Sequence, residues 1–206
     1  PTALSQCQPR PPAARNPNPA ANTAKPTFYH AQDGQDELVN NVLGGKTHGF
    51  FVEFGAGDGL FHSNSRFFED RLCWTGLCIE PSKFVFEKLV QNRPLCTRVH
   101  GAICGVDQEQ RMYTDVLSPT GWTGWSGFYS SFTDHHKQAI KEKIDTAGWR
   151  TESYMVTCHR LEQLLSELGP AGAQTSVDYL SVDTEGTERE IIDSIDFNRV
   201  KVSGVV

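Results

Sequence analysis

One short segment constrains the fold of this chain more than any other. An apolar run over residues 50–52 leads into an acid, Glu53, and then into glycines at the alternate positions Gly55, Gly57 and Gly59. A strand that ends in such a turn can bring backbone N–H groups against a ligand, because glycine has no Cβ atom in the way. The segment therefore predicts a buried strand followed by a ligand-binding turn. The alternative is a turn that serves only as a tight corner between strand and helix.

The spacing of the glycines indicates which ligand the turn would hold. A dinucleotide fingerprint, G-x-G-x-x-G, requires glycine at position 60, where this chain has Leu60. This departure argues against a nicotinamide-dependent oxidoreductase. The pattern acid-x-G-x-G-x-G instead resembles the first motif of S-adenosylmethionine (SAM)-dependent methyltransferases. SAM has no pyrophosphate that carboxylates would repel, so the resemblance implies that Glu53 and Asp58 lie beside the cofactor.

A second strand ends in an acid. Residues 76–79 form an apolar run that stops at Glu80, which Pro81 and Ser82 follow. In Rossmann-like folds an acid at the tip of the second strand accepts hydrogen bonds from ribose hydroxyls, because adjacent parallel strands bring their tips together. We therefore expect Glu80 to bind the ribose. The alternative is that Glu80 is a carboxylate that favours the start of a helix.

A third strand, over residues 178–182, ends in two acids, Asp183 and Glu185. We expect them at the same carboxyl edge of the sheet as the glycine turn, where open α/β sheets bind ligands. Close carboxylates raise each other's pKa, which suits a general base that removes a hydroxyl proton. We predict that Asp183 and Glu185 are catalytic. For Glu185 and Glu188, capping the helix that begins near Thr187 is an equal alternative.

Strand-like and helix-like segments alternate along the chain, which predicts βαβ units and one doubly wound, mostly parallel sheet of α/β class. The expected strands cover residues 49–54, 76–80, 97–104, 111–116, 153–158, 177–183 and 200–206. The expected helices cover residues 36–43, 63–72, 82–92, 133–147, 159–168 and 187–195. Several strands are nearly continuous apolar runs, as is typical of strands covered on both faces.

The first part of the chain differs from the rest. Residues 1–27 contain seven of the eleven prolines and few apolar side chains, so they predict a disordered stem or linker ahead of one domain at 28–206. The net charge is −6 and there is no lysine or arginine cluster, which argues against nucleic acid as a partner. No apolar run approaches the 18 residues typical of a membrane span.

The six cysteines leave the redox compartment open. Most lie in apolar, strand-like surroundings, so buried free thiols and disulfides are both consistent with the sequence. Their spacing does not fit a zinc site. A proline-rich stem ahead of a cysteine-containing domain favours the Golgi lumen or secretion, with the cytoplasm as the alternative, since no Asn-x-Ser/Thr glycosylation site occurs.

Two further segments admit more than one interpretation. Residues 118–132 are rich in glycine and aromatic residues, which is typical of either a lid or substrate platform or of a long surface loop. His135 and His136 lie on a polar helix with several lysines, so we expect both to be on a solvated helix face.

The order of these motifs resembles the FkbM-type methyltransferases. The resemblance covers about residues 32–206 and rests on the segments 32–36, 49–56, 63–65, 74–81, 178–186 and 195–197. It implies a Rossmann-like fold that binds SAM and methylates a hydroxyl group, often on sugars or polyketide-type products. The cofactor-binding residues that follow from the motifs and the resemblance are Glu53, Gly55, Ala56, Gly57, Asp58, Gly59, Ser63, Asn64, Glu80 and Pro81. Asp183 and Glu185 would lie near the transferred methyl group.

The end of the chain departs from the family pattern. The resemblance implies a sheet of seven strands, and Val206 falls inside what should be the fifth of them, so the last strands of the family's sheet do not follow. A sheet that ends there would expose backbone groups along its edge. We expect either that the chain is part of a longer protein or that a protein partner covers this edge, and we favour the first.

The leading hypothesis is a SAM-dependent O-methyltransferase that acts on a hydroxyl of a glycan or small molecule. The rival hypothesis is a methyltransferase-like domain kept as a structural or interaction module without turnover. The glycine turn and Glu80 favour cofactor binding, and they do not by themselves establish turnover.

Overall fold

A parallel sheet forms the centre of the structure, a computed structural model that describes residues 7–9, 28–169 and 176–204. The helices are α1 (Gln35–Val42), α2 (Arg66–Leu72), α3 (Lys83–Asn92), α4 (Asp134–Ala147), α5 (Leu161–Leu168) and α6 (Glu188–Ser194), with a 3₁₀ turn, η3 (Tyr129–Ser131). The strands are β1 (Phe50–Phe54), β2 (Thr75–Glu80), β3 (Thr97–His100), β4 (Ala102–Ile103), β5 (Gln110–Ser118), β6 (Gly121–Trp122), β7 (Arg150–His159), β8 (Ser176–Val177), β9 (Tyr179–Val182) and β10 (Lys201–Val202).

The strand order in the central sheet is β3-β2-β1-β9, and all neighbouring pairs are parallel. β8 and β9 follow one another directly, and β10 runs parallel to β8. Ser203 N donates to Val177 O and Leu180 N donates to Gly204 O, so the chain around β10 lies beside β8 and β9. The carboxyl ends of the central strands therefore lie at one edge, as the sequence predicted.

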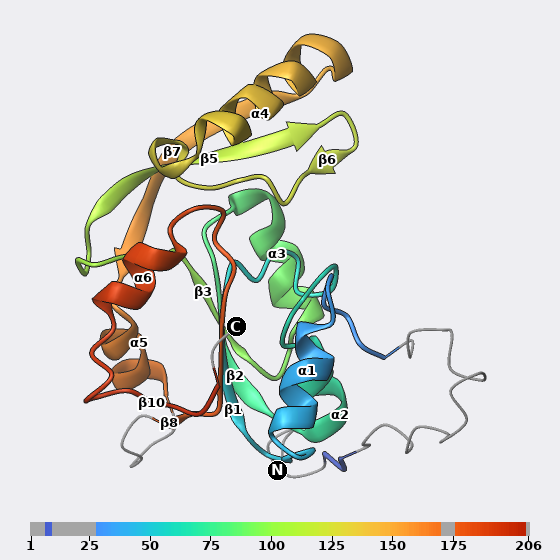
Figure 1. Ribbon diagram of the computed structural model, residues 1–206, viewed down its shortest axis with the longest axis vertical. Helices are drawn as coiled ribbons and strands as arrows, with labels where there is room; N and C mark the ends of the chain where they lie inside the picture. Colours follow the sequence, from blue (N-terminus) through green and yellow to red (C-terminus); the bar gives the residue numbers. More distant parts are fainter. Residues whose placement is uncertain (1–6, 10–27, 170–175, 205–206) are drawn as a thin grey trace.

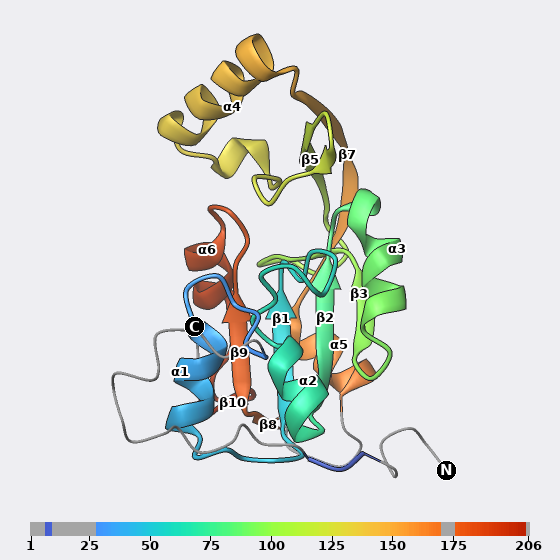
Figure 2. The same cartoon turned by 90° about the vertical axis from the view of Figure 1, so that its right-hand side faces the viewer.

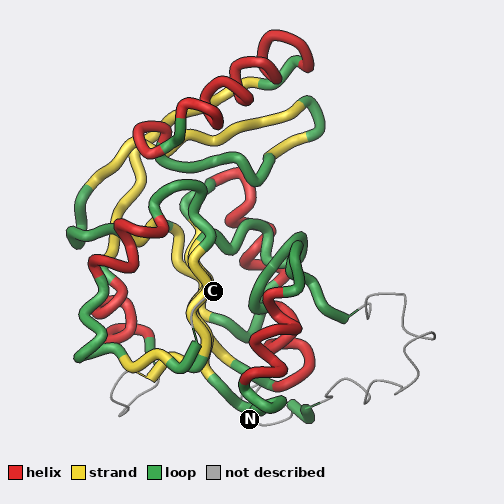
Figure 3. The backbone as a smooth tube through the Cα atoms, viewed as in Figure 1, coloured by secondary structure: helices red, strands yellow, loops and turns green. Residues whose placement is uncertain are grey.

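Helices cover both faces of this sheet (Figures 1 and 3). The side chains of β1 alternate: Phe50 and Val52 pack in the core under α5 and α6, whereas Phe51 packs against α2 and α3 on the other face. Each face has its own hydrophobic cluster, so β1 is buried along its whole length. The predicted α/β class with helices on both faces is confirmed for this part of the chain.

The region between β4 and α5 differs from the prediction of one mostly parallel sheet. In a second sheet, with order β4-β7-β5-β6, β5 pairs antiparallel with β6 on one side and with β7 on the other. Together with η3 and α4 they form a lobe beyond the carboxyl edge of the parallel sheet (Figures 1 and 2). The first half of β7, residues 150–153, is polar and largely exposed, and such a strand cannot occupy the interior of a sheet covered on both faces.

Two disulfides answer the question that the cysteine pattern left open. Cys104 and Cys158 join the end of β4 to β7, and Cys7 bonds to Cys73 at the end of α2. Cys78 and Cys96 are buried free thiols. Apart from residues 7–9, the predicted stem lies outside the described residues. Among the helices that the structure describes, none is long and apolar enough to cross a membrane.

The cysteine pairing makes a direct chemical prediction. We expect iodoacetamide to label only Cys78 and Cys96 when the protein is denatured without reductant, because the other four cysteines are in disulfides. Peptide mass spectrometry measures the sites, and labelling of all six cysteines after reduction is the control. Labelling of Cys104 or Cys158 before reduction would contradict this arrangement.

Candidate functional site

A cavity of about 390 Å³ lies where the central sheet meets the lobe. This volume falls in the range of about 300–1,000 Å³ that is typical of small-molecule sites. The lining residues come from the carboxyl ends of β1, β2, β3 and β9 and from the segment after β5. Those used below are Gly55, Ala56, Gly57, His62, Ser63, Asn64, Glu80, Pro81, Tyr113, Trp122, Trp125, Phe128, Asp183 and Glu185.

The glycine turn after β1 connects three strand ends. Gly55 N and Ala56 N both donate to Ile79 O at the end of β2, at 3.0 and 3.1 Å. Gly55 has φ +75°, and a Cβ atom placed on it would lie 1.9 Å from Asp183 O after β9. Only glycine fits both this left-handed conformation and this close approach. The turn thus forms a tight corner and also lines the cavity, and its binding of a ligand stays a prediction.

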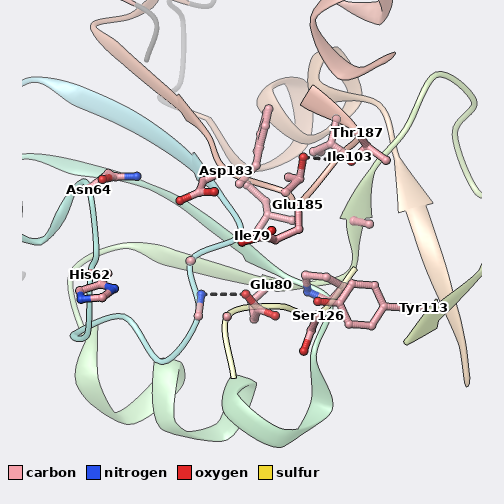
Figure 4. Close-up of a pocket in the computed structure, with 18 of the residues that line it drawn as sticks. His62, Asn64, Ile79, Glu80, Ile103, Tyr113, Ser126, Asp183, Glu185 and Thr187 are labelled. Atoms are coloured by element: carbon pink, nitrogen blue, oxygen red, sulfur yellow. Dashed lines mark hydrogen bonds between the residues drawn. The ribbon is translucent and has the colours of Figure 1, made fainter. Parts of the chain in front are cut away.

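Glu80 is buried beside this turn. Its Oε2 accepts a hydrogen bond from Gly57 N at 2.7 Å, and its Oε1 accepts one from Ser82 N at 2.7 Å. Burial raises the pKa of Glu80 to about 7, although the two backbone N–H groups oppose the shift. Glu80 is therefore tied to the turn and to the start of α3, and it lines the cavity from the tip of β2 (Figure 4).

Glu53 has a different position from the other predicted cofactor residues. It does not line the cavity: its carboxylate accepts hydrogen bonds from Asn64 N at 2.7 Å and from Ser65 Oγ at 2.8 Å, and also from Ser63 Oγ. These bonds hold residues 63–65, so Glu53 places Ser63 and Asn64 on the cavity wall. Its direct contact with a cofactor stays a prediction.

The same network contains Arg93, which the sequence analysis missed. Arg93 Nε lies 2.8 Å from Glu69 Oε2 and Arg93 Nη1 lies 3.4 Å from Glu53 Oε2. All three side chains are at most 2 % exposed. A buried arginine between two carboxylates neutralises charges that would otherwise be strongly unfavourable. No linear motif pointed to Arg93, since its partners lie 24 and 40 residues away.

Asp58 and Gly59 shape the turn without lining the cavity. Asp58 Oδ1 accepts hydrogen bonds from Leu60 N and Phe61 N, both at 2.9 Å. Gly59 has φ +77°, and a Cβ atom there would lie 2.5 Å from Arg93 Cγ. In the structure both residues support the segment that leads to residues 63–65, and their direct contact with a cofactor stays a prediction.

The acids after β9 divide into two roles. Glu188 caps the start of α6, because its Oε1 accepts hydrogen bonds from Thr184 N and Gly186 N. Asp183 and Glu185 line the cavity, and within the described residues neither carboxylate accepts a hydrogen bond that would fix it. Burial, with the nearby charges of Asp183 and Glu188, raises the pKa of Glu185 to about 7. The pKa of Asp183 is also raised, mainly by burial.

An aromatic wall faces these acids from the lobe. We use this name for Tyr113, Trp122, Trp125 and Phe128, which line the cavity. Figure 4 shows Tyr113 beside Ser126 on the far side of the cavity from His62 and Asn64. The segment over residues 118–132 therefore supplies part of the site, which favours the substrate-platform interpretation over a plain surface loop.

Two histidines lie near the acids, and the sequence analysis predicted neither of these contacts. His62 lines the cavity with Asp183, and its charge partly opposes the rise in the pKa of Asp183 that burial causes. The ring of His62 stacks on Phe61 with ring centroids 3.7 Å apart. His136 is half-buried near Glu185, so the predicted solvated helix face is wrong for His136 and holds for His135, which is exposed. No local sequence signal indicates either contact, since both depend on how distant segments meet.

The buried network around Arg93 should be essential for stability. We expect Arg93→Met to lower the free energy of unfolding by about 3–5 kcal/mol, because it leaves Glu53 and Glu69 buried without a cation. Urea denaturation followed by circular dichroism measures the change. The control is Arg189→Met, whose side chain is 94 % exposed and which should change stability by less than about 0.5 kcal/mol. Equal effects of the two substitutions would contradict the role of Arg93.

Comparison with known proteins identifies the family. The family model of the methyltransferase FkbM domain matches residues 53–206, a region that runs from Glu53 through Glu80, Asp183 and Glu185 to the end of the chain. Neither the curated proteins nor the solved structures gave a match. The family match covers most of the chain and agrees with the resemblance of the motifs. The protein therefore belongs to the FkbM methyltransferase family.

Proposed function

We propose that this protein is a SAM-dependent O-methyltransferase with a Rossmann-like, class I methyltransferase fold. One observation carries the proposal: the buried carboxylate of Glu80, at the tip of β2, is hydrogen-bonded to the glycine turn after β1 at the edge of the cavity. Adjacent parallel strands with this pair of tips form the nucleoside site of Rossmann-like folds. The parallel order β3-β2-β1-β9 supports the fold assignment.

The residues at the cavity fit SAM. Glu80 would accept hydrogen bonds from the ribose, while Gly55, Ala56 and Gly57 form the part of the cavity wall that the cofactor would lie against. Ser63, Asn64 and Pro81 complete this end of the cavity. When bound, SAM supplies a methyl group on a sulfonium ion, and the carbon–sulfur electron pair stays with sulfur as the new carbon–oxygen bond forms.

The cavity also contains a group that could accept the proton of the acceptor hydroxyl. Glu185 lines the cavity and has a pKa of about 7, which suits a general base at neutral pH. Asp183 also lines the cavity, and its charge helps to raise the pKa of Glu185. In this proposal Glu185 takes the proton that the acceptor oxygen loses, and Asp183 maintains the negative field around it.

The aromatic wall would bind the acceptor. Flat aromatic side chains favour ligands that present a ring, because stacking buries a large apolar area in a defined orientation. Trp122 and Trp125 line the same cavity as the acids, and the Trp122 ring lies against Gly57 of the glycine turn. This arrangement supports a glycan or a small ring-containing molecule as the acceptor.

The two disulfides support an oxidising compartment for the protein, such as the Golgi lumen or the extracellular space. Disulfides persist in secreted proteins and are rare in the reducing cytosol. We therefore propose that the protein acts in the secretory pathway.

Cofactor binding is tested most directly at Glu80. We expect Glu80→Gln to weaken the binding of S-adenosylhomocysteine, the product form of the cofactor, by about 10- to 100-fold, because hydrogen bonds to a charged carboxylate are lost. Isothermal titration calorimetry measures the affinity. The control is Glu87→Gln on the exposed side of α3, which should bind as the wild type does. A wild-type protein that binds neither SAM nor S-adenosylhomocysteine would overturn the proposal and favour a structural module without turnover.

Catalysis is tested at Glu185. The carboxylate must be ionised to accept a proton, so we expect the methylation rate to rise as the pH increases through about 7 and to level off above it. Glu185→Gln should lower the rate by about 10²–10⁴-fold and abolish this dependence. The assay follows the formation of S-adenosylhomocysteine from SAM with methyl glycosides and catechols as acceptors. Unchanged turnover in Glu185→Gln, with cofactor binding intact, would exclude Glu185 as the base and leave the cofactor site untouched.

A further inference from the structure

His136 lies in an aromatic pocket near the start of α4. Its ring stacks on Phe132 with centroids 4.2 Å apart and planes 9° apart, and it meets Trp125 edge-on at 5.8 Å. Its side chain is only 17 % exposed. The stacking fixes the ring plane, because rotation about its side-chain bonds would break both contacts. His136 therefore presents one edge of its imidazole in a defined direction.

That edge faces Glu185. His136 Nδ1 lies 3.9 Å from Glu185 Oε2, whereas His136 Nε2 is buried and has no hydrogen-bond partner among the described residues. A separation of 3.9 Å permits a strong charge interaction and is slightly longer than a hydrogen bond. Catalytic hydrogen bonds are often long in ligand-free proteins and shorten in the complex.

The backbone around Glu185 holds the carboxylate toward α4. Glu185 has φ +58°, a left-handed conformation that is unfavourable for a residue with a side chain. Gly186 follows with φ +112°, and a Cβ atom on it would lie 2.9 Å from Ser131 O of η3. The strand-end loop is therefore packed tightly against the lobe. Strain of this kind is found where the surrounding structure fixes a functional side chain.

The charges that surround Glu185 and His136 disfavour the ionised form of each group. Asp183 and Glu188 are the charged neighbours of Glu185 on its own segment, and both disfavour its ionised form. His135 is the titratable neighbour of His136 on α4, and burial lowers the pKa of His136. From the lobe, His136 of α4 lies close to the Glu185 carboxylate, and the charge of Glu185 also helps to raise the pKa of Tyr113 of β5. At 3.9 Å, ionisation of one group of the Glu185–His136 pair would shift the pKa of the other, so coupling follows from the geometry of the pair.

We propose that His136 is a positioning residue for Glu185: its stacked imidazole orients the Glu185 carboxylate at the cavity and is electrostatically coupled to it. The assignment of Glu185 as the proton acceptor rests on the proposed function, whereas the coupling itself does not. The lobe would then contribute to the proton-transfer step through α4 as well as to acceptor binding through the aromatic wall. Docking of α4 against the strand-end loop would be required for an active site.

The coupling is tested by nuclear magnetic resonance on the full chain, without cofactor or acceptor. Histidine ring ¹⁵N and ¹H signals are followed from pH 5 to pH 9, and we expect His136 to show an added inflection near the pKa of Glu185, about 7. Glu185→Gln should remove this inflection, because the amide does not ionise. Glu185→Asp should keep an inflection, because it restores the charge in a residue type that tolerates φ +58°.

Two controls separate coupling from other effects. His135, the exposed neighbour on α4, should give the same single transition in all three proteins, and Asp193→Asn, an exposed acid on α6, should leave the His136 curve unchanged. Backbone amide spectra verify that each variant is folded. Identical His136 curves in the wild type and in Glu185→Gln would overturn the inference. Loss of cofactor binding with a coupled pair would overturn the proposed function alone.

Discussion

The close contact of three strand ends is the constraint on which the rest of the site depends. Gly55 N and Ala56 N bond to Ile79 O of β2, and the Cα of Gly55 lies against Asp183 O after β9. No larger residue fits at Gly55, so the tips of β1, β2 and β9 meet only because this position is glycine. Glu80 and Asp183 reach the same cavity as a direct consequence.

The second lobe completes a site that the central sheet leaves open. The parallel strands provide the glycine turn and the acids, while the lobe provides the aromatic wall. The lobe also bonds to α3 and to the segment before it: Lys83 N at the start of α3 donates to Tyr154 Oη of β7, and Tyr154 Oη also bonds to Pro81 O at 3.5 Å. These contacts fix the lobe on the side of α3, and the contact of Gly186 with η3 fixes it on the side of α6.

Most of the secondary structure could be predicted from the sequence, because each apolar run and each cap is a local signal. Ser82 caps α3 by accepting a hydrogen bond from Phe84 N, and Gly148 ends α4 in a left-handed conformation; serine and glycine are typical residues at these positions. The antiparallel lobe could not be predicted in this way, since the same strand pattern fits either sheet until partners are known. Arg93 and His136 were missed for the same reason: burial and charge pairing between distant segments decide their roles.

The distribution of charge distinguishes the supporting acids from those at the cavity. Glu53 and Glu69 have Arg93 as a buried counter-ion, so their charge is neutralised within the protein. Glu80, Asp183 and Glu185 line the cavity, where the described lining residues include no lysine or arginine, and the pKa of each is raised by burial. A positive ligand charge in this cavity would favour their ionised forms and so gain binding energy. The sulfonium of SAM has that positive charge, whereas these acids would repel a pyrophosphate. Leu60 leads to the same conclusion, because a dinucleotide fingerprint requires glycine at its position.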